Sequence, residues 1–185
     1  EFTKDPVIDW HEAVHPLLMQ ALKRENRKIV PLDIRLTEEN HILLISGPNA
    51  GGKSVCLKTV GLVQYMLQCG LLIPLKEGSK TGIFRQLFIH IGDEQSLEND
   101  LSTYSSHLMN MKHFVKHSNE NTLVLIDEFG SGTEPMLGGA IAEAILGKLN
   151  DVRTFGVITT HYSNLKHFAS SADGIINGAM LYDSQ

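Results

Sequence analysis

The chain has 185 residues, of which 42% are hydrophobic and 20% are charged, and this ordinary usage excludes disordered and collagen-like proteins. At ~100–200 residues per domain, the length predicts one domain over residues 1–185. The chain has 16 Lys and Arg against 21 Asp and Glu, a net charge of −5 that disfavours gripping of a nucleic-acid backbone by this domain itself. No apolar stretch is long enough to predict a membrane span.

The first residues of the chain and its two cysteines bear on the size of the whole protein and on its compartment. The chain begins Glu1-Phe2-Thr3, with neither a Met nor a signal segment, so we expect a fragment of a longer protein. Cys56 and Cys69 form no C-x-x-C pair, which predicts neither a zinc site nor a disulfide framework. A reduced, cytoplasmic compartment is therefore the expected location.

Short apolar runs alternate with helical patterns along most of the chain. Residues 1–40 fit this pattern least well and are expected to form a small antiparallel flank. Strands are predicted over residues 41–46, 83–91, 122–126 and 155–160, and helices over 56–70, 103–115 and 137–149. The alternation predicts an α/β fold with a mostly parallel sheet and helices on both faces.

A phosphate-binding motif follows the first buried strand. Residues 47–54 read Gly-Pro-Asn-Ala-Gly-Gly-Lys-Ser and match G-x-x-x-x-G-K-[ST], the P-loop pattern, between a predicted strand and a helix. Glycines let backbone N–H groups converge on phosphate oxygens, and the helix N-terminus adds its positive dipole end. Lys53 is expected to bind the β- and γ-phosphates of ATP, and the Ser54 hydroxyl to bind Mg²⁺. The predicted nucleotide-binding residues are Gly47, Pro48, Asn49, Ala50, Gly51, Gly52, Lys53, Ser54 and Val55.

Two carboxylates end the strand at residues 122–126. In a P-loop enzyme the first acid, here Asp127, holds Mg²⁺, and the next, Glu128, polarises the attacking water. The alternative is that both residues are simply solvated acids at the end of a strand. The P-loop motif earlier in the chain disfavours this interpretation. Asp127 is therefore the predicted metal partner and Glu128 the predicted catalytic base.

Histidines are common in this chain, so each one needs its context. His161 directly follows a predicted strand and could reach a γ-phosphate, although nine histidines make coincidence easy. His113 and His117 lie one helical turn apart, but the sequence offers them no third metal ligand nearby. We therefore expect these two side chains on an exposed helix face.

Ser102 lies near the start of a predicted helix and has two interpretations. As an N-cap it would satisfy backbone N–H groups of its own helix. Its hydroxyl, at an outward-facing helix N-terminus, would equally suit a nucleotide phosphate held by another subunit.

Taken in order, the motifs resemble the ATPase domain of the MutS family, and nearly the whole chain takes part in the resemblance. "GDEQS", "LSTYSSH" and "GSGTEP" are more similar to the second bacterial MutS branch than to the mismatch-correcting one. Tyr104, where Phe is common, and the local variants Ala50 and Cys56 are departures that remove no reacting group. The matching blocks are residues 9–18, 47–58, 91–107, 125–139 and 159–165.

The resemblance implies a P-loop fold of the ATP-binding-cassette type that closes as a homodimer on ATP. It places Ser102 as the signature serine against the partner's γ-phosphate, His161 as the switch histidine, and residues 130–133 along the dimer seam. The second branch is associated with suppressing recombination and, in some members, with collided ribosomes. DNA, or alternatively a ribosome, would then be contacted by parts outside this fragment, with no membrane involved.

The sequence therefore predicts hydrolysis of ATP to ADP and phosphate, with Lys53, Ser102, Glu128 and His161 as the reacting-site residues. A transporter-type ATPase subunit is one alternative, disfavoured because residues 101–105 read Leu-Ser-Thr-Tyr-Ser instead of LSGGQ. An ATP-gated clamp without significant turnover is the other, disfavoured by the presence of Glu128.

Overall fold

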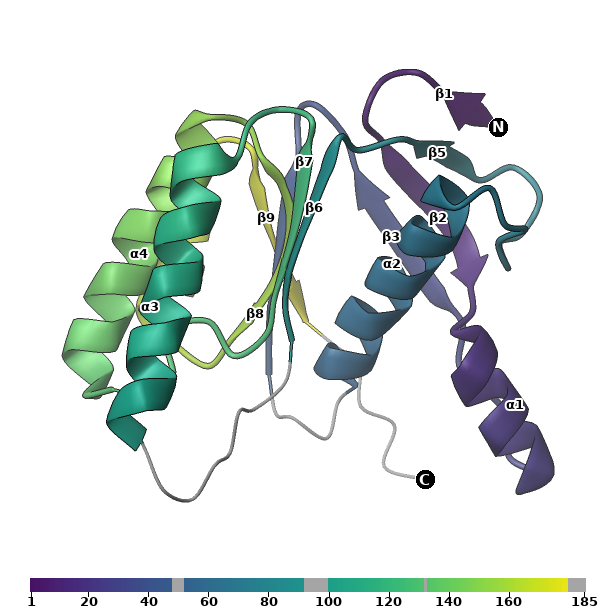
Figure 1. The fold of residues 1–185 in the computed structure, drawn as a ribbon, viewed down its shortest axis with the longest axis horizontal. Coiled ribbons are helices and arrows are strands. Elements are labelled where there is room, and N and C mark those ends of the chain that lie inside the picture. The colour runs from purple at the N-terminus through teal and green to yellow at the C-terminus, as the bar shows by residue number, and fades with distance from the viewer. Residues whose placement is uncertain (48–51, 92–99, 132, 180–185) are drawn as a thin grey trace.

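A computed structural model describes residues 1–47, 52–91, 100–131 and 133–179, with the backbone alone described for residues 100–103. The predicted α/β architecture, with a mostly parallel sheet and helices, is confirmed (Figure 1). Pro48, Asn49, Ala50 and Gly51 lie outside the described residues.

The main sheet has five strands in the order β6-β7-β8-β4-β9, and every neighbouring pair is parallel. Because all five strands run the same way, their carboxyl ends meet at one edge of the sheet. The bounds are β4 (Ile42–Ser46), β6 (Gln86–His90), β7 (Thr122–Ile126), β8 (Phe155–Thr160) and β9 (Ile175–Ala179).

Helices cover both faces of this sheet, with α2 on one side and α3 and α4 on the other (Figure 1). The alternation of side chains along β7 shows why. Leu123 and Leu125 pack with α2, whereas Val124 and Ile126 pack with α3, α4 and α5. The bounds are α2 (Lys53–Gln68), α3 (Asp100–His117), α4 (Pro135–Asp151) and α5 (Ser163–Ser171).

The N-terminal segment forms most of a second, four-stranded sheet in the order β1-β5-β2-β3. The pairs β2–β3 and β2–β5 are antiparallel, but β1 is parallel to β5. The segment also contains a helix, α1 (Pro16–Arg24), which begins with Pro and continues with good helix formers. The bounds are β1 (Phe2–Thr3), β2 (Ile8–Ala13), β3 (Leu32–Leu36) and β5 (Lys80–Gly82).

The second sheet packs over α2 and closes the core on that side. Ile8, Trp10 and Leu36 are at most 1% exposed and share a cluster with Leu57 and Val60 of α2. Burying each such side chain contributes about 1.5–3 kcal/mol, so the flank fixes α2 firmly against the main sheet. Among the described residues, no helix has the length and hydropathy needed to cross a membrane.

Candidate nucleotide-binding site

The predicted site residues gather at the carboxyl edge of the main sheet. Gly47 follows β4, Asp127 and Glu128 follow β7, and His161 follows β8. Since β7, β8 and β4 are consecutive strands, these turns lie next to one another. The sheet order therefore brings together residues that are far apart in sequence.

Lys53 is the first residue of α2, and its side chain turns back toward the end of β4. It is 1% exposed, and its ammonium Nζ donates a hydrogen bond to the carbonyl oxygen of Gly47. Gly52, the N-cap, has φ = 84°, a left-handed conformation that favours glycine and lets the chain turn sharply into the helix. Next along α2, Ser54 is half-buried, and Val55 is 43% exposed.

The surroundings of Lys53 shift the pKa of its ammonium in two opposing ways. Burial lowers the pKa of its ammonium, while the negative charges of Asp127 and Glu128 act in the opposite direction. A desolvated ammonium gains more than an exposed one from an approaching anion, because less water screens the pair. The position is therefore suited to phosphate.

Asp127 and Glu128 are held by hydrogen bonds to β8. The Thr159 hydroxyl donates to Asp127 Oδ1 at 2.5 Å, and the Glu128 N–H donates to Thr159 Oγ1 at 2.9 Å. Glu128 also has φ = 49°, a left-handed conformation that is uncommon for a residue with a Cβ. Backbone strain of this kind clusters at functional sites.

His161 lies between the lysine and the glutamate. Its Nε2 is 3.4 Å from Lys53 Nζ and 4.0 Å from Glu128 Oε1. The structure thus brings together three of the four predicted reacting residues. The backbone of the fourth, Ser102, lies in α3, but its side chain lies outside the described residues.

Tyr162, which sequence reasoning missed, organises the turn after β7. Its hydroxyl donates to the Gly130 carbonyl at 3.0 Å, and a Cβ added to Gly130 would lie 2.7 Å from the Tyr162 ring. Gly130 also has φ = 91°, so this position of the predicted dimer seam requires glycine for both its backbone and its packing. Gly132, within the same seam, lies outside the described residues.

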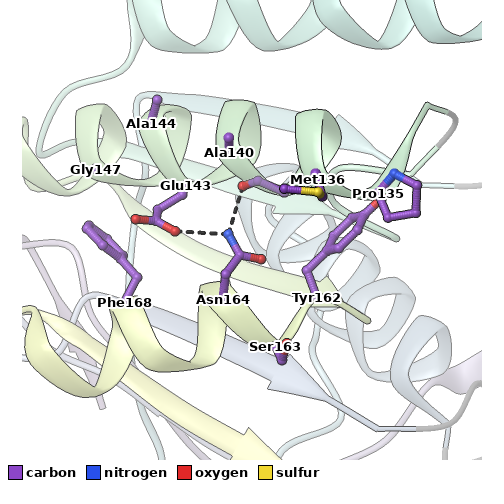
Figure 2. Close-up of a pocket in the computed structure, with 11 residues that line it drawn as sticks. Pro135, Met136, Ala140, Glu143, Ala144, Gly147, Tyr162, Ser163, Asn164 and Phe168 are labelled. Carbon is purple, nitrogen blue, oxygen red and sulfur yellow. Dashed lines mark hydrogen bonds between the residues drawn. The ribbon is translucent and has the colours of Figure 1, made fainter.

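Beside this turn, a groove runs between α4 and α5 (Figure 2). The Asn164 amide spans it, donating to Glu143 Oε2 at 2.9 Å and to the Gly139 carbonyl at 3.0 Å. None of the predicted nucleotide-binding residues lines this groove, so it is distinct from the site at the strand ends.

Of the other chemistry-bearing residues, His113 and His117 are exposed on α3, as predicted, with ring centroids 4.5 Å apart. In the described part of the chain, no group of three or more His, Cys, Asp or Glu residues could hold a metal ion. Cys56 and Cys69 are both free, and burial raises the pKa of the Cys56 thiol to about 12.

A second histidine pair, which the sequence analysis did not single out, ties α3 to the sheet. His107 Nδ1 lies 2.8 Å from His90 Nε2 at the end of β6, and the backbone carbonyl of His90 accepts a hydrogen bond from the Asp127 N–H at 2.8 Å. Burial, together with the neighbouring His90, lowers the pKa of His107 to about 4. One nitrogen must donate and the other accept, so the contact requires at least one of the two rings to be neutral.

We predict that His107 makes the stability of the protein pH-dependent below pH 6.5. Its pKa in the folded protein lies below its ordinary value of 6.5, so the unfolded chain takes up the proton first as the pH falls. The stability contributed by neutral His107 is complete above pH 6.5 and is lost toward pH 4, at up to about 1.4 kcal/mol per pH unit. Urea unfolding at several pH values should show a flatter profile for His107→Phe than for the wild type.

The exposed His113 on the same helix supplies a control, since His113→Phe should keep the wild-type slope. Burial also lowers the pKa of His41 and of His15, so the difference between the profiles isolates His107. Parallel profiles for His107→Phe and the wild type would contradict the assignment.

Comparison with known proteins agrees with the order of these motifs. A family model described as MutS domain V matches residues 43–184. Proteins named Endonuclease MutS2 are 49% identical over 176 residues in Lachnoclostridium phytofermentans and 46% over 177 residues in Pelotomaculum thermopropionicum. These matches cover 95% and 96% of this chain, but 21% and 22% of the relatives, so the chain spans about a fifth of their length.

Proposed function

The chain belongs to the MutS family and, within it, to the MutS2 branch, and on this basis we propose that it is an ATP-binding-cassette-type P-loop domain that hydrolyses ATP to ADP and phosphate. MutS-family proteins are ATPases in general. The transporter-type alternative is set aside, because the family match is to MutS domain V.

One observation carries the proposal: a buried lysine, a glutamate and a histidine meet at the start of α2. His161 Nε2 lies 3.4 Å from Lys53 Nζ and 4.0 Å from Glu128 Oε1, although 108 positions separate His161 from Lys53. A structural ion pair needs only two of these groups. A cation, a base and a second hydrogen-bonding group beside a helix N-terminus are what phosphoryl transfer to water requires.

The residues at the site fit a nucleotide triphosphate and Mg²⁺. The helix N-cap is Gly52, which has no side chain to satisfy the first backbone N–H groups of α2, so these remain suited to an anion. Asp127 and Ser54 supply the carboxylate and hydroxyl oxygens that Mg²⁺ prefers, and would hold the ion. When bound, Mg²⁺ neutralises charge on the phosphate oxygens.

Each protein group then has one role. Lys53 binds the terminal phosphates, and Glu128 accepts the proton of the attacking water as a general base, typically worth ~10²–10⁴-fold in rate. His161 donates a hydrogen bond to the γ-phosphate, which places it to respond to loss of that group. The presence of Glu128 in this position favours turnover over an ATP-gated clamp.

The proposed purpose of hydrolysis is mechanical. ATP closes a homodimer in which Ser102 of each chain contacts the nucleotide of the other, and hydrolysis reopens it. The net charge of −5 offers little attraction to phosphate backbones, so we place contacts with DNA, or with a ribosome, outside this chain. No nuclease step is assigned to its residues.

Mixing two inactive variants tests the composite site. Lys53→Ala and Ser102→Ala chains should each be impaired alone, but a mixed dimer regains one site with an intact Lys53 and an intact Ser102. Phosphate release from a 1:1 mixture should reach about a quarter of the wild-type rate, because half of the dimers are mixed and each has one intact site. The assay uses protein concentrations high enough that the specific activity no longer rises with concentration, so that all chains are in dimers.

Exchange of subunits is checked with two differently tagged chains. Mixed dimers without recovered activity would contradict the composite site, provided that a covalently linked dimer carrying one Lys53→Ala lesion retains activity. That linked dimer shows whether one site can work alone.

A further inference from the structure

A single buried hydroxyl joins the two carboxylate residues of the proposed site. Thr159 is 0% exposed, and its Oγ1 donates to Asp127 Oδ1 at 2.5 Å while accepting from the Glu128 N–H at 2.9 Å. Both hydrogen-bonding functions of the hydroxyl are therefore spent on neighbouring residues with proposed catalytic roles.

The register of the sheet explains this arrangement. The last paired residues of β7 and β8 are Ile126 and Ile158, so Asp127 and Thr159 are the next residues along the two strands. Residues opposite each other on neighbouring strands direct their side chains to the same face. A buried hydroxyl costs free energy unless it is hydrogen-bonded, and Val would fill the same space and suit a strand equally well.

Glu128 needs such support because its backbone is strained. With φ = 49°, it occupies a conformation that costs a residue with a Cβ of order 1–2 kcal/mol. Its N–H donates to Thr159 Oγ1 at 2.9 Å and, less closely, to Asp127 Oδ1 at 3.2 Å, and its carbonyl accepts from the Ser131 N–H at 3.0 Å. The conformation is thus fixed from both sides, and Thr159 supplies a bond from the neighbouring strand β8.

We propose that Thr159 is a positioning residue for ATP hydrolysis, whose hydroxyl holds the Asp127 carboxylate and the Glu128 backbone in one fixed relation. The inference rests on the proposed function and extends it to a residue that does not touch the nucleotide. Thr159 orients Glu128, the proposed base. Its bond to one carboxylate oxygen of Asp127 orients the other oxygen to face the metal ion.

Further hydrogen bonds of Thr159 and Thr160 connect the segment that carries Glu128 to the segment that carries His161. Thr159 lies two residues before His161, and its carbonyl accepts from the Phe129 N–H at 2.8 Å. Thr160 adds a further bond, from its hydroxyl to the Phe129 carbonyl at 3.2 Å. Several hydrogen bonds therefore join residues 127–129 to residues 159–161, and they fix the position of Glu128 relative to His161.

The test compares Thr159→Val, which removes the hydroxyl at constant volume, with Thr159→Ser, which restores it. Thr159→Val should lower kcat about 10- to 100-fold while the KM for ATP changes by less than about 2-fold, since the phosphate-binding residues remain intact. Thr159→Ser should recover most of the rate. Thr122→Val removes an equally buried hydroxyl at the other end of β7 and should keep the wild-type kcat.

A second readout needs no ATP. In the nucleotide-free chain, hydrogen exchange of the Glu128 amide, followed by NMR, should accelerate about tenfold in Thr159→Val and return toward the wild-type rate in Thr159→Ser. An unchanged Glu128 exchange rate in Thr159→Val would overturn the inference, as would an unchanged kcat. A third outcome separates the two proposals. If exchange accelerates in Thr159→Val but the wild-type chain releases no phosphate, the result counts against the proposed ATPase function alone.

Discussion

Replacing Lys53 with alanine is expected to weaken the binding of ATP by about 10- to 100-fold, the usual effect of losing a hydrogen bond to a charged group. Lys53 is buried at the start of α2, so little water screens its ammonium and a bound anion interacts with it more strongly than with an exposed lysine. Equilibrium titration with a fluorescent ATP analogue measures the loss.

Two further variants make this prediction specific. Alanine leaves a void because Lys53 is only 1% exposed, whereas Lys53→Met removes the charge and keeps most of the volume. Both should lose affinity, and Met should retain more of the free energy of unfolding. Lys58→Ala removes the same charge from the exposed side of α2 and should bind ATP as the wild type does. Unchanged affinity in Lys53→Met would argue against the phosphate-binding assignment.

Glu128→Gln should separate binding from hydrolysis. The amide keeps the shape of the side chain and makes the same demand on the left-handed backbone at φ = 49°, but it cannot accept a proton from water. ATP affinity should stay near the wild-type value while kcat falls about 10²–10⁴-fold. An ATP-bound dimer should accumulate, which light scattering in the presence of Mg²⁺ and ATP would detect.

The matched control is Glu120→Gln, the same chemical change on an exposed residue just before β7. It should leave both affinity and turnover unchanged. If Glu128→Gln turned over ATP at the wild-type rate, Glu128 would not be the base, and the bonds that hold it would need another explanation.

The sequence predicted the main sheet well because its signals are local. Each buried strand is a short apolar run, and the phosphate-binding motif lies at a strand–helix boundary that its mechanism requires. The predicted strand at 83–91 is shorter in the structure, Gln86–His90. β9 was missed because three of its five residues, in Ile-Ile-Asn-Gly-Ala, are of types depleted in strands, and the segment pairs along the free side of β4.

The supporting contacts of the site could not be predicted, because they depend on register and on packing. Thr159 is 32 positions from Asp127, and its role follows only once β7 and β8 are aligned. Tyr162 and Gly130 likewise meet through the packing of two turns. For the His90–His107 pair a signal did exist: His90 lies one residue before the end of a predicted strand, and His107 ends the matching block that follows it.

The most direct test of the central claim is single-turnover phosphate release from ATP bound to the chain with Mg²⁺, compared between wild type and Glu128→Gln at equal ATP occupancy. We expect the wild type to convert its bound ATP to ADP and phosphate, and Glu128→Gln, equally loaded, to do so about 10²–10⁴-fold more slowly. Equal rates for the two, or a wild-type chain that binds no ATP, would contradict the claim.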